Sequence, residues 1–213
     1  MNSTRVLILG ASGQIARQLI TALASHSSIH ATLFLRDAAK IRDLDTTGMT
    51  VIEGDVADEA ALGRAVAEQQ IVIASLAGGM ESHARHIVAA MKAHGVKRLA
   101  FVASLGIYDE VPGAFGKWNN EMIGDDLKPY RRAADFIEAA GLDTTIIRPA
   151  WLTDEDEVAY ETTTRHQPFK GTEVSRKSVA TYLLTLAGDP SKDVGQSVGL
   201  NKPGTDGDKP AFM

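Results

Sequence analysis

Residues 10–16 read Gly-Ala-Ser-Gly-Gln-Ile-Ala, directly after an apolar run at residues 6–9 and directly before an amphipathic stretch. A glycine at a strand end permits a tight turn, a second glycine lets the backbone approach a pyrophosphate, and a small residue lets the next helix pack closely on the strand. The N–H groups at the start of that helix would point at the phosphates. A plain glycine turn is the alternative, but the strand before and the helix after favour a dinucleotide site. Its predicted residues are Gly10, Ala11, Ser12, Gly13, Gln14 and Ile15.

The end of the second predicted strand carries Arg36, followed by Asp37. In a dinucleotide site the residue at this strand end meets the adenosine ribose, where a carboxylate accepts from a free 2′-hydroxyl and an arginine binds a 2′-phosphate. Arg36 therefore predicts NADP (NADPH) in preference to NAD. Asp37 keeps NAD as an alternative, because a strand end placed from sequence can shift by a residue. A solvated surface role for Arg36 is the third interpretation.

Two further strand ends carry acidic or small residues. Asp55 and Val56 follow the third predicted strand, where a carboxylate can accept a hydrogen bond from the adenine amino group. Leu76, Ala77 and Gly78 follow the fourth, where small residues let the backbone pass a ribose. Each group would be an ordinary turn in isolation, but their order along the chain assigns them to the same site.

These loops need a framework, and the chain alternates short β-branched runs with amphipathic stretches. Continuous apolar runs such as residues 6–9 and 71–74 are typical of strands covered on both faces. The pattern predicts an α/β fold: a single-domain, Rossmann-type, doubly wound parallel sheet of about seven strands with helices on both faces. The expected strands span residues 5–9, 31–35, 49–53, 71–74, 99–103, 144–148 and 195–200, and the expected helices lie near 13–25, 58–69, 80–94, 129–140 and 175–187.

Residues 1–201 are expected to form the NAD(P)-binding domain, and 202–213 a C-terminal tail of surface coil. Within the domain, segments 105–128 and 149–174 show no clear period and are expected to be active-site loops. Both follow a strand end. Both would therefore lie along the carboxyl edge of the sheet, where open α/β folds bind ligands.

The composition limits the classes of partner and the compartment. The 213 residues carry a net charge of -5 and no cysteine, which excludes disulfides, thiolate nucleophiles and cysteine-ligated metals. No basic patch suits nucleic acid, no apolar run approaches the ~20 residues of a membrane helix, and the N-terminal apolar run is too short for a secretory leader. We expect a cytoplasmic protein with a small-molecule substrate and no nucleic-acid or membrane partner; the sequence specifies no oligomeric state. The acidic run at residues 154–157 is interpreted as a solvated loop.

Taken together, these motifs resemble those of the short-chain dehydrogenase/reductase superfamily, in its atypical branch of NmrA-like and biliverdin-IXβ (flavin) reductase-like proteins. The resemblance covers nearly the whole chain and rests on segments 10–15, 36–37, 54–56, 101–104, 141–143 and 147–150. It implies an NAD(P)-binding protein. The roles that it implies are the 2′-phosphate for Arg36, the adenine for Asp55 and Val56, the ribose side for Ala77 and Gly78, and the neighbourhood of the nicotinamide for Pro149 and Ala150.

Catalysis in that superfamily typically uses a serine at the end of the fifth strand and a Tyr-x-x-x-Lys pair on the next helix. Ser104 matches the serine, but the pair is missing: Leu127 stands near the tyrosine position, and Arg131 or Arg132 near the lysine position. An arginine can bind a ribose or phosphate, but with a pKa above about 12 it cannot share a proton at neutral pH. Tyr108 is the remaining phenol near Ser104. We therefore predict Ser104, Tyr108 and Arg131 as catalytic residues, with Ser104 and Arg131 also touching the cofactor; a turn-capping Ser104 and a packing Tyr108 are the alternatives.

Two other pairs of residues could take part in a site. His83 and His86 have the spacing to share a metal, but no third ligand completes the set, so we interpret them as solvated or capping histidines and predict no metal. Trp118 and Trp151 lie one in each aperiodic segment. They either stack on a planar substrate or belong to the core.

The sequence thus predicts an NADP(H)-dependent oxidoreductase that transfers hydride to a small planar or carbonyl substrate. Flavin- or quinone-like acceptors are favoured because they need no strong acid. The alternative is a non-catalytic NADP(H) sensor acting through protein partners, which the missing Tyr/Lys pair favours and the short chain disfavours. A sugar-nucleotide epimerase would need a substrate domain, for which residues 149–174 are too few.

Overall fold

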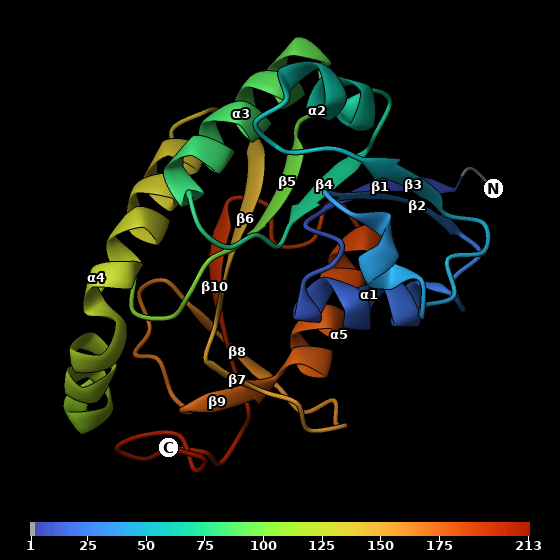
Figure 1. Ribbon diagram of the computed structural model, residues 1–213. Coiled ribbons are helices and arrows are strands. Elements are labelled where there is room, and N and C mark those ends of the chain that lie inside the picture. The colour runs from blue at the N-terminus through green and yellow to red at the C-terminus, as the bar shows by residue number, and fades with distance from the viewer. Residues whose placement is uncertain (1–2) are drawn as a thin grey trace.

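A computed structural model describes residues 3–213 and shows helices packed around one large sheet (Figure 1). In chain order the elements are β1 (Thr4–Leu9), α1 (Gln14–Leu23), β2 (Ile29–Leu35), the 3₁₀-helix η1 (Ala38–Ile41), β3 (Thr50–Glu53), α2 (Glu59–Val66), β4 (Ile71–Ala74), α3 (Met80–Ala93), β5 (Arg98–Val102), α4 (Gly113–Glu138), β6 (Asp143–Pro149), β7 (Trp151–Thr153), β8 (Glu161–Thr164), β9 (Glu173–Ser175), α5 (Arg176–Gly188) and β10 (Gln196–Asn201). Among these residues, eight strands form a sheet in the order β3-β2-β1-β4-β5-β6-β10-β8, and β7 pairs with β9 separately. Only β8 runs antiparallel, against β10.

Helices cover both faces of the large sheet. α1 and α5 pack against each other on one face, and α3 packs between α2 and α4 on the other. Side chains of β1 alternate between the two cores, with Val6 and Ile8 beneath α1 and α5, and Leu7 and Leu9 beneath the other three helices. This is why β1 reads as a continuous apolar run. The predicted α/β fold with a mostly parallel, doubly wound sheet is confirmed.

The strand order reverses at β1, whose neighbours in the sheet are β2 and β4. The chain first builds outward through β2 and β3, then crosses back to build β4, β5 and β6 on the other side of β1. In open α/β sheets the crevice at such a reversal, outside the carboxyl ends of the strands, is where ligands bind. The loops that follow β1, β2, β3 and β4 converge on this crevice.

Segment 105–128, expected to be a loop, is helical from Gly113 onward. α4 runs for 26 residues and carries Pro129 in its interior. A proline lacks the backbone donor and clashes with the preceding turn, so a proline within a helical pattern suggests a helix start. The helix expected near residues 129–140 instead begins at Gly113, and the connection between β5 and α4 is only residues 103–112.

Segment 149–174 also departs from the expected loop, because it contains β7, β8 and the first residues of β9. The threonine-rich β8 adds an eighth strand at the sheet edge, where Thr164 pairs with Val198. The tail 202–213 contains no helix or strand, as expected, but it is tied to the fold. The carbonyl oxygen of Thr205 accepts from the backbone N–H of Thr172 at 3.1 Å and from its hydroxyl at 2.7 Å.

None of the helices that the structure describes combines the length and the apolar character needed to span a membrane.

Candidate functional site

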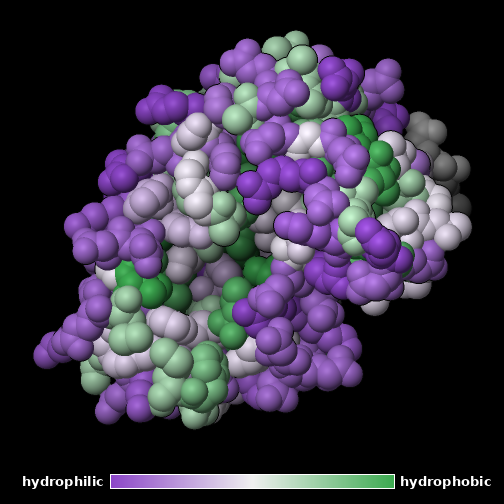
Figure 2. Space-filling view, in the orientation of Figure 1, coloured by the Kyte–Doolittle hydropathy of each residue, from purple (hydrophilic) through white to green (hydrophobic). Residues whose placement is uncertain are grey.

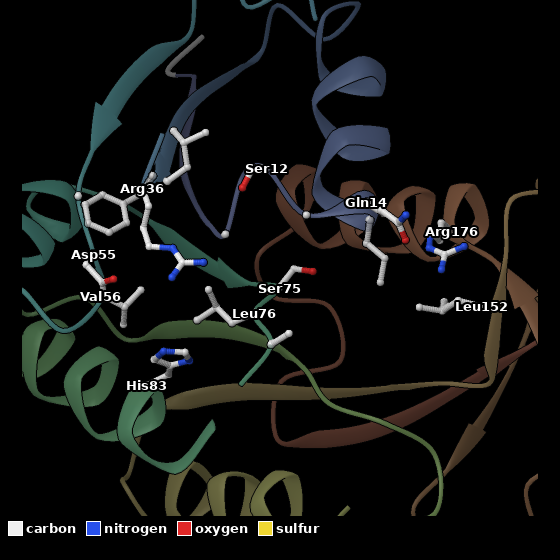
Figure 3. Close-up of a pocket in the computed structure, with 17 residues that line it drawn as sticks. Ser12, Gln14, Arg36, Asp55, Val56, Ser75, Leu76, His83, Leu152 and Arg176 are labelled. Carbon is white, nitrogen blue, oxygen red and sulfur yellow. The ribbon is translucent and has the colours of Figure 1, made fainter. Parts of the chain in front are cut away.

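A cavity of about 350 Å³ lies at the switch point (Figure 3). The surface is hollowed near the centre of the space-filling view, and apolar residues show at the bottom of the hollow (Figure 2). The lining comes from the ends of β1 to β4, the start of α3, and β7 and α5 from the distant part of the chain. Its residues are Gly10, Ser12, Gly13, Gln14, Ile15, Phe34, Leu35, Arg36, Gly54, Asp55, Val56, Ser75, Leu76, Ala77, His83, Leu152 and Arg176.

The loop after β1 is pressed against the end of β4. Gly10 has a φ of +78°, and a Cβ there would lie 2.3 Å from the carbonyl oxygen of Ser75 and 2.9 Å from Leu76 Cδ2. The N–H groups of Gly10 and Ala11 donate to the carbonyl oxygen of Phe34 at 3.1 and 3.2 Å, which ties the loop to β2. The fold itself therefore requires glycine at position 10.

Gly13 holds a different position, as the N-cap of α1 with φ -70° and ψ 153°. A Cβ at this residue would lie 3.2 Å from the carbonyl oxygen of Gly10, a mild crowding that the fold can accommodate. No side chain caps α1 and its first turn carries no acidic residue, so the positive end of the helix is not neutralised. The backbone N–H groups of the first turn of α1, directly after Gly13, have no partner within the helix. Because Gly13 lines the cavity, these N–H groups are available to a phosphate there.

Arg36 and Asp37 have separate roles at the end of β2. Asp37 Oδ1 accepts from the N–H of Ala39 at 2.9 Å and so caps η1, and Asp37 is not among the lining residues. Arg36 is exposed, lines the cavity, and makes no ion pair or hydrogen bond with any other residue in the range 3–213. In Figure 3 its guanidinium extends toward the loop that carries Ser12.

The predicted adenine-side and ribose-side residues Asp55, Val56, Leu76 and Ala77 line the cavity, and His83 joins them from near the start of α3. The interpretation of His83 as a solvated or capping residue was wrong. It is half-buried, and its Nδ1 is buried without a hydrogen-bond partner among the described residues. Burial lowers the pKa of His83, and the charge of Asp55 offsets part of that effect.

The far end of the cavity is closed by Leu152 from β7 and Arg176 from the first turn of α5. Figure 3 places both beside Gln14, on the opposite side of the glycine loop from Arg36. Sequence reasoning missed both residues: Leu152 lies in a segment without a clear period, and Arg176 opens a predicted helix that carries no strand-end motif. It also missed Phe34, Leu35 and His83.

Several predicted cofactor residues lie outside the lining. Ala11 is fully buried beneath the loop, and Gly78 follows Ala77 with a φ of +70°. Ser104, Pro149 and Ala150 lie just beyond or at the carboxyl ends of β5 and β6, as the resemblance implied, and Ala150 is buried. Their contact with a cofactor stays a prediction.

Tyr108 and Arg131 are gathered in a separate cluster and do not line the cavity. The guanidinium carbons of Arg165 and Arg131 lie 3.7 and 4.8 Å from the centre of the Tyr108 ring. Arg131 Nε pairs with both carboxylate oxygens of Asp135 at 2.8 and 2.9 Å, and its Nη1 donates to the carbonyl oxygen of Ile107 at 3.1 Å. The structure therefore does not bring Arg131 to a ribose or phosphate in this cavity.

A buried ion pair between Arg148 and Glu110 anchors this cluster. The two carboxylate oxygens of Glu110 also accept from the N–H groups of Gly106 and Tyr108, each at 2.9 Å. Burial is the main cause that raises the pKa of Tyr108 to about 12, and its hydroxyl has no hydrogen-bond partner within residues 3–213. Tyr108 is consequently a protonated, fixed residue, consistent with its packing interpretation.

Trp118 and Trp151 contact each other, with ring centroids 4.8 Å apart. Trp151 Nε1 donates to Asn119 Oδ1 at 2.9 Å, and both indoles pack on the core beneath α1 and α5. The two partly buried rings thus join the start of α4 to β7, a packing that favours the core interpretation.

The acidic run at residues 154–157 is more than a solvated loop. Three of its members pair with cations from α5 and the tail: Asp154 with Arg176 at 2.8 Å, Asp156 with Lys177 at 2.6 Å, and Glu157 with Lys202 at 2.7 Å. Across residues 3–213, no group of three or more histidine, cysteine or acidic side chains is placed to hold a metal.

Comparison with known proteins assigns the chain to a family. A family model described as NAD(P)H-binding matches residues 10–190. The chain belongs to this NAD(P)H-binding family. A Rossmann-fold NAD(P)-binding family protein from Shigella flexneri is 51% identical over 100% of both chains, with a TM-score of 0.86. A short-chain dehydrogenase/reductase (wide type) from Veillonella parvula, solved in complex with NADP, is 30% identical over 98% of this chain and 99% of that chain, with a TM-score of 0.88.

Among curated proteins, Quinone oxidoreductase 2 of Escherichia coli (strain K12) is 26% identical over 176 residues, which are 78% of this chain and 55% of that protein. The chain spans between 35% and 60% of the length of the curated relatives it matches. The resemblance of this NAD(P)H-binding protein to the atypical short-chain dehydrogenase/reductases is confirmed.

Proposed function

We propose that this NAD(P)H-binding protein is an NADP(H)-dependent oxidoreductase that transfers hydride to a small planar acceptor of the quinone or flavin class, or to a carbonyl compound. The observation that carries the proposal is the cavity itself. Among the residues that the structure describes, it has an arginine without a partner at one end, and no tyrosine or lysine in its lining.

The lining residues fit NADPH in one direction. Arg36 would bind the 2′-phosphate, Asp55 and Val56 would face the adenine, and the start of α1 beyond Gly13 would hold the pyrophosphate. Asp37, the residue that kept NAD as an alternative, is engaged in capping η1. NADPH, when bound, supplies the hydride; the chain supplies the binding groups and the orientation.

The lining carries no tyrosine or lysine, and its histidine, His83, lies on the adenine side with Asp55 and Val56, which restricts the acceptor. A carbonyl that becomes an alkoxide needs an acid nearby, and general acid catalysis contributes roughly 10²–10⁴-fold. Tyr108 lies outside the lining, its pKa is raised to about 12, and arginines hold its ring. Quinones and flavins accept hydride and take their proton from water, so orientation is enough to promote their reduction. The quinone oxidoreductase among the relatives supports this acceptor class.

NADPH oxidation at 340 nm against a panel of quinones, free flavins and simple ketones tests the proposal. We expect quinones and flavins to be reduced at least about a hundredfold faster than ketones, which is the lower bound of what a missing acid costs. Ketones reduced as fast as quinones would contradict the reasoning about the missing acid.

The second candidate function is a non-catalytic NADP(H) sensor, which the absence of tyrosine and lysine from the lining also favours. It predicts tight NADPH binding with no turnover of any acceptor in the panel. The same measurements, with NADPH binding followed separately by calorimetry, therefore distinguish the two.

A further inference from the structure

Arg176 is a positively charged residue of the cavity wall that has no role in the cofactor binding described above. It is the first residue of α5, its side chain is 18% exposed, and it lines the cavity beside Leu152. Its Nη1 donates to Asp154 Oδ1 at 2.8 Å. Its Nε is buried and has no hydrogen-bond partner among the described residues. One of the five N–H donors of the guanidinium is thus engaged in a side chain–side chain contact, while another is buried and unused.

The direction of the cofactor places Arg176 at the reacting end of the cavity. If the 2′-phosphate lies at Arg36 and the pyrophosphate at Gly13, the nicotinamide half must continue past the start of α1. Figure 3 shows Leu152 and Arg176 in that direction, close to Gln14 and far from Arg36. The acceptor has to meet the nicotinamide, so it enters near Arg176.

We propose that Arg176 recognises a negatively charged substituent, a carboxylate or sulfonate, on the planar acceptor. The inference rests on the proposed function, since it takes the direction of the cofactor from it. Asp154 fixes one edge of the guanidinium and leaves the remaining N–H groups for a second anion. Arginine suits this role because its donors form a rigid fork that matches two acceptor oxygens.

The environment supports an anion of the ligand rather than a structural ion pair as the partner of Arg176. Asp154 is 78% exposed, so solvent screens its pair with Arg176 from the aspartate side and the pair contributes little to folding. A buried donor without a partner is uncommon in native proteins and calls for a partner beyond the chain, such as an ordered water or a ligand atom. The start of α5 adds a favourable dipole for negative charge.

Lys177 provides a matched control on the same turn of α5. Like Arg176 it pairs with an aspartate of the 154–157 run, Asp156, at 2.6 Å, but it is 42% exposed and does not line the cavity. Arg176→Gln and Lys177→Gln therefore remove one positive charge each from neighbouring positions. A general effect of charge would appear in both variants, and a specific contact only in the first.

The experiment measures binding of naphthalene-2-sulfonate and of naphthalene-2-sulfonamide, which has the same ring without the charge, to the protein saturated with NADP⁺. Calorimetry should show that the sulfonate binds the unmodified protein more tightly than the sulfonamide does. We expect Arg176→Gln to weaken sulfonate binding by about tenfold to a hundredfold, the worth of one charge-assisted hydrogen bond. Sulfonamide binding and the affinity for NADP⁺ should change by less than about threefold, and Lys177→Gln should leave all three affinities unchanged.

Three results would overturn the inference: equal affinities of the two naphthalenes in the unmodified protein, competition between the sulfonate and NADP⁺, or a comparable loss of NADP⁺ affinity in Arg176→Gln. The last two would make Arg176 a residue of the phosphate site. Failure of the proposed function is seen separately. A protein that binds the sulfonate through Arg176 but reduces no quinone keeps the anion site and loses only the oxidoreductase assignment.

Discussion

Replacing Arg36 by alanine isolates the contribution of one guanidinium to the choice between NADPH and NADH. Arg36 has no ion-pair or hydrogen-bond partner within residues 3–213, so its removal leaves no buried group unpaired. The free energy of unfolding of the unliganded protein should therefore change by less than about 0.5 kcal/mol, as for other surface substitutions. Any change in cofactor affinity then reports the contact with the cofactor itself.

The magnitude follows from the kind of contact expected. A hydrogen bond between an arginine and a phosphate contributes roughly 1.5–3 kcal/mol, so Arg36→Ala should weaken NADPH binding about tenfold to a hundredfold. NADH has no 2′-phosphate, and its affinity should stay within about threefold. Because Arg36 is exposed, salt screens its charge: the Debye length falls from about 10 Å at 0.1 M to about 3 Å at 1 M. The preference for NADPH should shrink with added salt in the unmodified protein and respond much less in the variant.

Calorimetric titrations of both cofactors at two salt concentrations measure these quantities. Arg42→Ala is the control, because Arg42 is exposed, follows η1 directly and lies outside the cavity, with its Nε donating to the carbonyl oxygen of Ala39 at 3.2 Å. It should leave both affinities unchanged. Equal affinities for NADPH and NADH in the unmodified protein, or an equal loss of both in Arg36→Ala, would refute the assignment of Arg36 to a 2′-phosphate.

Two further comparisons test the loop and the tyrosine. Gly10→Ala should lower the free energy of unfolding by more than about 2 kcal/mol, because φ is +78° and the new methyl meets the carbonyl oxygen of Ser75 at 2.3 Å. Gly13→Ala should change the free energy of unfolding by less than about 1 kcal/mol but weaken NADP⁺ binding by about tenfold or more. Near-normal NADP⁺ binding in this variant would show that the loop is misassigned. Tyr108→Phe removes a buried hydroxyl without a partner, so the free energy of unfolding should stay the same or rise by up to about 1 kcal/mol. Quinone reduction should be nearly unchanged. A thousandfold loss of kcat in Tyr108→Phe, with cofactor binding intact, would restore a tyrosine mechanism.

The part of the site that follows strand ends could be predicted from the sequence. In a parallel sheet all strand ends point to one edge, so the residues directly after β1, β2, β3 and β4 share a crevice whatever the helices between them do. Gly13, Arg36, Asp55 and Ala77 were found in this way, and all four line the cavity. Their position depends only on where an apolar run stops.

The other wall could not be found by the same reasoning. Leu152 and Arg176 are separated by a segment whose short strands carry threonines and charges instead of a clear apolar period. They reach the cavity because β7 pairs with β9 and α5 packs against α1, both of which are contacts between distant parts of the chain. His83 was missed for a related reason, since a histidine near a helix start has several ordinary roles. Packing, and not spacing, brings it to the cavity.

Arg131 shows how a local pairing can overrule a resemblance. Its place near the lysine position of the superfamily suggested a ribose or phosphate contact, but Asp135 stands one turn further along α4 and binds the same guanidinium. An arginine and an aspartate at this spacing lie on one face of a helix, so the sequence contained the competing interpretation. Arg131 is held by Asp135 and by the carbonyl oxygen of Ile107, and the Tyr108 ring packs against its guanidinium. Tyr108 and Arg131, which were predicted to take part in catalysis, therefore have structural roles. Under the proposed function, reduction would then depend on how the cavity orients cofactor and acceptor, which favours acceptors that take their proton from water.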